Sequence, residues 1–202
     1  DEVKHEITRW FVLASVFKRY TGRLETDLFN DINAIGQGKG VRGLLENVGM
    51  RAVPMSALEG DYERYHLSLL LILYQKLGAR DWDLKTRPVP RKISELPRIE
   101  LHIHHIFPEK ILRDQGLDEL KDDIGNITII SQKANEDIKY KMPINYLKER
   151  YDADPKLLEA HFIPLNRELW SIKNYKEFLE ERRKLIAEAL EKYLGLTISR
   201  EA

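Results

Sequence analysis

The stretch LHIHHIFPEK, from Leu101 to Lys110, holds three histidines within four positions and ends them at an Ile-Phe-Pro. The whole chain has six histidines in 202 residues, so half of them lie in this one segment. Histidine is a poor core residue and an ordinary surface residue, so a cluster needs a reason, and the usual reasons are metal binding and proton transfer. The cluster therefore indicates a metal site or a proton-transfer site, with chance as the alternative.

Around this cluster the sequence changes to a period of two. Ile99, Leu101 and Ile103 alternate with polar residues, a pattern that predicts a half-buried strand with the apolar residues on its buried face. A second strand is predicted over GNITIIS, residues 125–131, and the segment QKANEDIKYK after it reads as a helix up to Pro143. The expected local order is therefore strand, loop, strand, helix.

The rest of the chain shows helical spacing of apolar residues, with a long central helix expected from Met55 to a stop at Gly78. The expected fold class is α+β, predominantly α-helical, with helical segments flanking the strand–strand–helix core. We expect four regions: a helical region at 1–79, a proline-rich linker or loop at 80–98, the core at 99–150, and a helical region at 151–202 that packs on the core.

Composition limits the possible functions. The chain has 33 basic and 33 acidic residues, so any site for a polyanion must be local. The absence of cysteine excludes disulfides and thiolate metal sites, and nothing argues for secretion. No signal peptide is visible, and the longest apolar run, residues 67–74, is too short to cross a bilayer. We therefore expect a cytoplasmic protein with no membrane partner. Its start at Asp1, without a methionine, suggests a fragment of a longer protein.

The residues that carry chemistry lie where the first strand ends. On a regular strand His104 and His105 would point to opposite faces, but where a strand breaks, neighbouring side chains can converge on one site. Pro108 fits such a break, since it cannot continue a strand ladder. One histidine could then bind a metal while the other stays free as a base. Asn135 could add an oxygen ligand, and Asn126 could brace the loop that carries the histidines.

Taken together, HHIFP, IGNITII and the following asparagine resemble the His-Asn-His (HNH), or ββα-metal, nuclease motif. More narrowly, the segment from Glu100 to Glu149 is similar to the C-terminal nuclease domain of GmrSD-type restriction endonucleases, which are modification-dependent defence enzymes against phage DNA. A looser resemblance covers Asp1 to Tyr20, the HFIPLN segment, and Phe178 with Arg182. The other half of that family, an NTP-binding domain with a DGQQR-like motif, has no counterpart in this chain.

The resemblance implies a role for each residue of the motif. His105 occupies the position of the general base, which takes a proton from the water that attacks a DNA phosphorus. His104 occupies the first metal-ligand position, where many relatives have Asp, and Asn135 occupies the second. Asn126 occupies the bracing position and is grouped with His105 in the catalytic set. The implied cofactor is a divalent ion: Mg is possible, and imidazole also suits Mn, Co, Ni or Zn.

The implied partners are DNA, in particular modified phage DNA, and the NTP-binding half of the full-length protein or complex. Lys139 and Lys141 are the best candidates for phosphate contacts, with an ordinary solvated helix face as the equal alternative. Two other functions remain open. One is a non-catalytic DNA- or protein-binding module that keeps the nuclease fold, and the other is an RNase or toxin with the same site. Nothing in the sequence predicts the oligomeric state.

Overall fold

The structure, a computed structural model, describes residues 2–49, 51–87 and 89–196. The chain forms two compact units, one made of residues 1–57 with 187–202 and one made of residues 58–186. We call these the terminal unit and the central unit. In the described residues the architecture is mainly helical with one two-stranded antiparallel sheet, which confirms the predicted fold class.

The terminal unit contains three short helices near the start of the chain. They are α1 (Glu2–Val16), α2 (Leu24–Gly36) and α3 (Gly40–Val48). Both α1 and α2 pack on α3. Leu28, Ile32 and Ile35 on α2 are 46%, 58% and 56% exposed. The helical spacing of these three residues therefore marks an exposed apolar face of α2 and not a buried one.

The central unit supplies the remaining elements. They are α4 (Arg64–Leu77), β1 (Leu101–His105), α5 (Glu109–Asp114), β2 (Ile127–Ser131), α6 (Gln132–Ile138), α7 (Pro143–Ala153), α8 (Lys156–Glu159) and α9 (Tyr175–Leu194), the last counted here up to Ile186. The helix expected from Met55 begins only at Arg64, because Glu63 and His66 form a capping box that starts it there. Gly78, with a φ of 64°, ends it as predicted.

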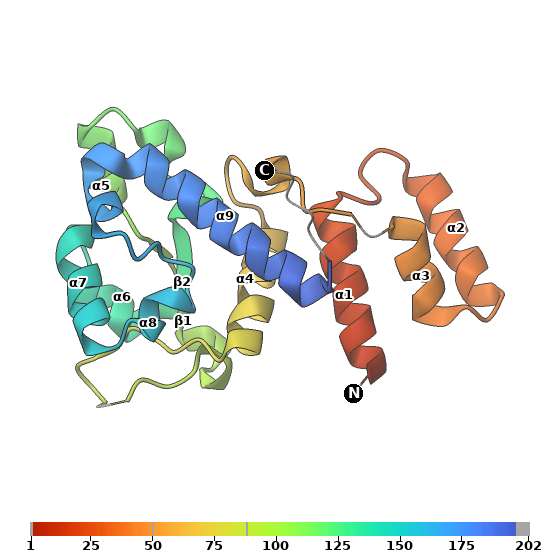
Figure 1. Ribbon diagram of the computed structural model, residues 1–202, viewed down its shortest axis with the longest axis horizontal. Helices are drawn as coiled ribbons and strands as arrows, with labels where there is room; N and C mark the ends of the chain where they lie inside the picture. Colours follow the sequence, from red (N-terminus) through yellow and green to blue (C-terminus); the bar gives the residue numbers. More distant parts are fainter. Residues whose placement is uncertain (1, 50, 88, 197–202) are drawn as a thin grey trace. The chain divides into compact units, whose positions relative to one another are not determined.

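The two strands pair antiparallel, with His104 opposite Thr128 and His105 opposite Ile127. Helix α6 contacts both strands and α4 contacts β2, and Figure 1 shows these helices on either side of the strand pair. All five residues of β2 are buried. β2 is thus enclosed within the central unit, whereas β1 is only partly buried, and the connection from β1 to β2 carries α5.

The predicted buried face of the first strand is wrong. Ile99 precedes β1 and is 87% exposed, and Ile103 is 41% exposed, whereas His104 is only 3% exposed. The reason lies in the aromatic side chains on the other face: Trp82 and Tyr146 both pack edge-on against the His104 ring. Tertiary packing has therefore placed a polar position of the alternating pattern in the interior.

A cluster of large side chains fills the central unit beneath the strands. Its members include Trp82, Phe107, Ile130, Tyr146, Trp170 and Phe178. Trp82 comes from the irregular segment 80–98, and its Nε1 donates to the carbonyl of Leu157 at 3.0 Å. Part of that segment therefore belongs to the core under the histidines. Within the described ranges, no helix is both long enough and apolar enough to cross a membrane.

Candidate functional site

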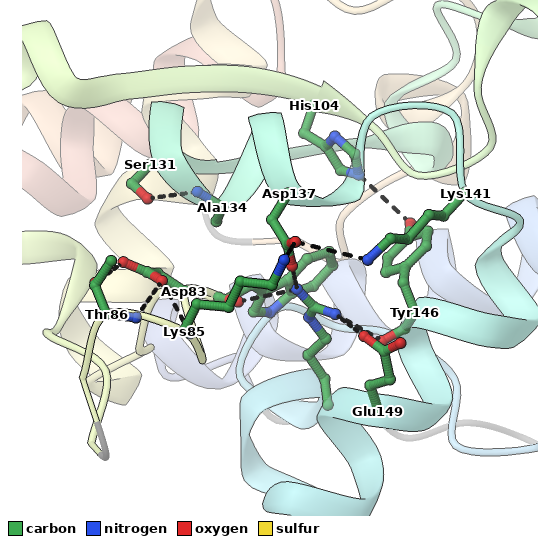
Figure 2. A network of polar contacts seen from close by, with 12 residues as sticks. Asp83, Lys85, Thr86, His104, Ser131, Ala134, Asp137, Lys141, Tyr146 and Glu149 are labelled. Atoms are coloured by element: carbon green, nitrogen blue, oxygen red, sulfur yellow. Dashed lines mark hydrogen bonds and ion pairs between the residues drawn. The ribbon is translucent and has the colours of Figure 1, made fainter.

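His104 and Asn135 meet where β1 lies against α6. The His104 Nδ1 and the Asn135 Oδ1 are 2.8 Å apart. The start of α6 is fixed by Ser131, whose side chain accepts from the backbone N–H of Ala134 at 3.1 Å, as Figure 2 shows. The backbone N–H of Ser131 in turn donates to Asp81 at 2.8 Å. This cap fixes where the first turn of α6 begins, and it therefore places Asn135 beside His104.

The His104 imidazole is held in its neutral form. Burial lowers its pKa to about 4, although the hydrogen bond with Asn135 acts in the opposite direction. At neutral pH the ring therefore carries no charge. Because a metal binds the unprotonated nitrogen of a neutral imidazole, His104 has the protonation state that a metal ligand needs.

Tyr146 lies on the other side of the His104 ring. Its hydroxyl oxygen is 3.4 Å from His104 Nε2, and its own hydrogen is donated to the carbonyl of Ile106 at 2.7 Å. Toward Nε2 this oxygen can therefore act only as an acceptor, across the contact drawn between the two residues in Figure 2. In the metal-free protein the ring hydrogen lies on Nδ1, because the amide oxygen of Asn135 can only accept. Metal binding through Nδ1 would require that hydrogen on Nε2, where the Tyr146 oxygen can accept it. Burial raises the pKa of Tyr146, so this hydroxyl stays protonated.

The spacing of this pair suits two ligands of one cation. With metal–ligand bonds of about 2.1 Å at right angles, the two ligand atoms stand about 3 Å apart. The observed 2.8 Å between Nδ1 and Oδ1 is close to that separation. Across the described ranges, no group of three or more His, Asp or Glu side chains is arranged for a metal. An ion bound here would thus take its remaining ligands from water and substrate.

His105 has different surroundings. Its Nε2 is 2.9 Å from Asp122 Oδ1, and its Nδ1 is 3.6 Å from Glu109 Oε1. A carboxylate oxygen can only accept, so the hydrogen belongs on Nε2 and the neutral ring keeps a lone pair on Nδ1. The His105 side chain is 21% exposed, against 3% for the whole of His104. One histidine is therefore accessible as a proton acceptor while its neighbour is enclosed.

The two histidines share one pocket of about 320 Å³. His105 is the last residue of β1, so the pocket lies at the end of this strand. The lining includes His104, His105, Asn135, Glu109, Lys110, Arg113 and Lys139. This hollow thus combines a neutral imidazole beside an amide oxygen, a second imidazole and several cations, which is a combination suited to a phosphate group and a divalent ion.

Asn126 lies behind the pocket and is fully buried. Its side-chain oxygen accepts from the backbone N–H of Phe107 at 2.8 Å. Its amide nitrogen donates to the carbonyls of Phe107 at 3.1 Å and Lys121 at 2.8 Å. Asn126 therefore ties the chain just after the histidines to the chain just before β2. The structure places it as a brace, away from the pocket lining.

The two lysines singled out in the sequence have separate positions. Lys139 lines the histidine pocket and has a φ of 43° at the end of α6. Lys141 is 3.6 Å from Asp137, which also pairs with Lys85 and Arg150 in the network of Figure 2. Burial alone would raise the pKa of Asp137, but hydrogen bonds from Lys85 and Arg150 outweigh it and lower the pKa. The structure brings only Lys139 to the histidines.

Sequence reasoning missed several residues at or behind this pocket. Glu109 and Lys110 directly follow Pro108, so their position beside the histidines was a usable signal. Asp122 and Tyr146 reach the histidines only through the fold. No local pattern marks either of them, because each lies many residues from the cluster in the sequence.

Comparison with known proteins places these residues in a family. A family model described as "GmrSD restriction endonucleases, C-terminal domain" matches residues 57–189, which include the whole central unit. The uncharacterized protein MJ0686 of Methanocaldococcus jannaschii is 24% identical over 221 residues. That match covers 92% of this chain but only 36% of the relative. No solved structure gives a significant match. Since the family model covers more than half of the sequence, the chain belongs to the family of C-terminal domains of GmrSD restriction endonucleases.

Proposed function

We propose that the central unit is a metal-dependent DNA endonuclease of the HNH, or ββα-metal, type, with residues 99–150 as the nuclease core. It would hydrolyse phosphodiester bonds within a GmrSD-like restriction and phage-defence protein. The observation that carries this proposal is the shared pocket of His104 and His105. There a buried neutral imidazole faces an amide oxygen at 2.8 Å, and the neighbouring imidazole is accessible. Family membership supports the same class of activity.

In this proposal His105 is the general base. Its Nδ1 would take a proton from a water molecule as the water oxygen attacks phosphorus, and the bond from phosphorus to the 3′ oxygen would break. Asn126 would hold the histidine loop in place through its contacts with Phe107. His104 and Asn135 would hold a divalent ion, Mg or one of Mn, Co, Ni and Zn. Such an ion supplies charge stabilisation at the scissile phosphate and at the leaving oxygen.

Lys139 would contact the DNA backbone at the edge of the pocket. Lys141 could also contact the DNA backbone, but only if its ion pair with Asp137 were broken. The Lys141 side chain is 40% exposed, and exposed ion pairs contribute little to stability, so this exchange would cost little. We further propose modified phage DNA as the substrate and an NTP-binding half as the partner that selects it.

The test is incubation of the protein with supercoiled plasmid and each divalent metal, alongside calorimetric titration of Mn. We expect nicking that stops when a chelator is added. We expect Mn binding in the wild type and in His5→Ala, a control at an exposed histidine of α1, but not in a His104→Ala, Asn135→Ala double variant. Equal Mn binding by the double variant would show that the metal site is misassigned.

Two outcomes of the same experiment would favour the other functions. DNA binding without nicking under any metal would favour a non-catalytic module that keeps the nuclease fold. Cleavage of RNA with no cleavage of DNA would favour an RNase or toxin. The pocket offers groups for a phosphate, which both nucleic acids share, so the two substrates must be compared directly.

A further inference from the structure

His105 has one carboxylate partner within hydrogen-bond distance. Asp122 Oδ1 is 2.9 Å from His105 Nε2, while Glu109 Oε1 is 3.6 Å from Nδ1, which is too far for a hydrogen bond. The other oxygen of Asp122 lies 3.7 Å from Lys121 Nζ, so Oδ1 remains available to the histidine. The contact thus fixes which ring nitrogen bears the hydrogen.

The backbone around Asp122 is itself anchored. Its carbonyl accepts from the backbone N–H of Tyr62 at 2.8 Å, and the next residue, Asp123, forms a β-bridge with Asp61. On the other side, Asn126 donates to the Lys121 carbonyl at 2.8 Å. The carboxylate is therefore presented from a segment held at both ends, and it does not depend on a flexible loop.

Asn126 links both members of this contact. One amide group binds Lys121, the residue before Asp122, and also Phe107, two residues after His105. One buried side chain therefore connects the segment of the carboxylate with the segment of the imidazole. The hydrogen bonds of Asn126 therefore align Asp122 with His105 as well as shaping the loop.

We infer that Asp122 is a positioning residue for His105: it holds the ring so that Nε2 carries the hydrogen and the lone pair of Nδ1 is directed into the pocket. This inference rests on the proposed function, because orientation matters only if His105 accepts a proton. An imidazole on a rotatable side chain can present either nitrogen at many angles, and orienting it removes unproductive arrangements before the reaction begins. Asp122 itself touches neither water nor phosphate in this role.

The contact can be tested without any activity. In protein with ¹⁵N-labelled histidine, we expect the His105 Nε2 proton to be protected from exchange with solvent. Asp122→Ala should lose this protection. Glu119→Ala, which removes the same charge from an exposed position of the same segment, should keep it. A protected Nε2 proton in Asp122→Ala would overturn the inference. If that variant does not fold, Asp122→Asn keeps an acceptor oxygen, and loss of the protected proton there would also count against it.

A double-mutant cycle tests the role in the reaction. Asp122→Ala should lower kcat about 10- to 100-fold, as expected for the loss of an orienting partner, with little change in KM. In a His105→Ala background the same substitution should have no further effect on the residual cleavage. A residue needed only for stability would reduce activity in both backgrounds, and that result would refute the positioning role. If wild-type protein never nicks DNA, the proposed function fails, while the exchange measurement still decides the contact.

Discussion

Lys139→Gly should make the protein more stable and weaken its hold on DNA. Lys139 follows α6 with φ 43° and ψ −113°, a region that side chains other than glycine rarely adopt. Holding such a residue there costs about 1–3 kcal/mol. Glycine relieves this strain but loses about 0.5–1 kcal/mol through its greater freedom in the unfolded chain. The net gain in the free energy of unfolding should be roughly 0–2.5 kcal/mol. Since Lys139 is exposed, little packing is lost.

The same substitution, Lys139→Gly, should weaken DNA binding. Lys139 lines the histidine pocket beside Lys110, so its ammonium is placed to meet a backbone phosphate. Loss of one phosphate contact reduces the slope of log K against log salt concentration by about 0.9. The strain at this position would then be retained because it places a cation at the edge of the site.

Urea unfolding and DNA titrations at several salt concentrations, without added metal, measure both effects. Lys139→Ala removes the charge but keeps a side chain on the strained backbone, so it should weaken binding equally without the gain in stability. Lys184→Ala, at an exposed lysine of α9, should leave the salt slope unchanged. The reasoning would be refuted if Lys139→Gly were less stable than wild type, or if it bound DNA with the wild-type slope.

Three further predictions concern groups behind the pocket. Tyr146→Phe removes the acceptor for the Nε2 hydrogen that His104 would carry when a metal is bound at Nδ1. The substitution should weaken Mn binding about tenfold, which calorimetry would detect; unchanged affinity would exclude this role. Burial lowers the pKa of His104 to about 4 and that of His161 to about 3. As the pH falls, both imidazoles therefore take up protons at a higher pH in the unfolded chain than in the folded protein. Stability should therefore fall as pH drops from about 6.5 toward 4, by up to about 2.7 kcal/mol per pH unit, and equal urea midpoints at pH 7 and pH 5 would contradict this. Arg182→Met removes the guanidinium that donates to the carbonyls of His161, Ile124 and Gly125, and it should destabilise the protein by on the order of 3 kcal/mol in urea unfolding. A wild-type midpoint would show that these bonds contribute nothing.

The strand–loop–strand–helix order could be read from the sequence because each step has a local cause. Alternation, a proline after the histidines and a serine cap before α6 all act within a few residues. The buried face of β1 could not be read in this way. Alternation shows that two faces differ, but Trp82 and Tyr146, distant in sequence, decide that His104 and not Ile103 is enclosed.

The same distinction between local causes and contacts distant in the sequence applies to the candidate site. His104, His105 and Asn135 could be singled out because their types and spacing match a known motif, and the structure does place them around one pocket. Asp122 could not, since an aspartate in a charged turn looks like any solvated residue until the fold brings it to within 2.9 Å of His105. A residue that orients a catalytic side chain is generally hard to recognise in a sequence, because it needs only one contact and no fixed distance along the chain from its partner.

Cleavage by His105→Ala tests the central claim most directly. Wild-type protein and the variant should be compared by plasmid nicking at several concentrations of Mg and Mn, with DNA binding and Mn binding measured on the same samples. The proposed mechanism predicts that the variant binds both ligands like wild type and loses cleavage by on the order of 10²–10⁴-fold, the usual contribution of a general base. Nicking by His105→Ala at near the wild-type rate would contradict the mechanism, and the accessible histidine of the pair would then have no catalytic role.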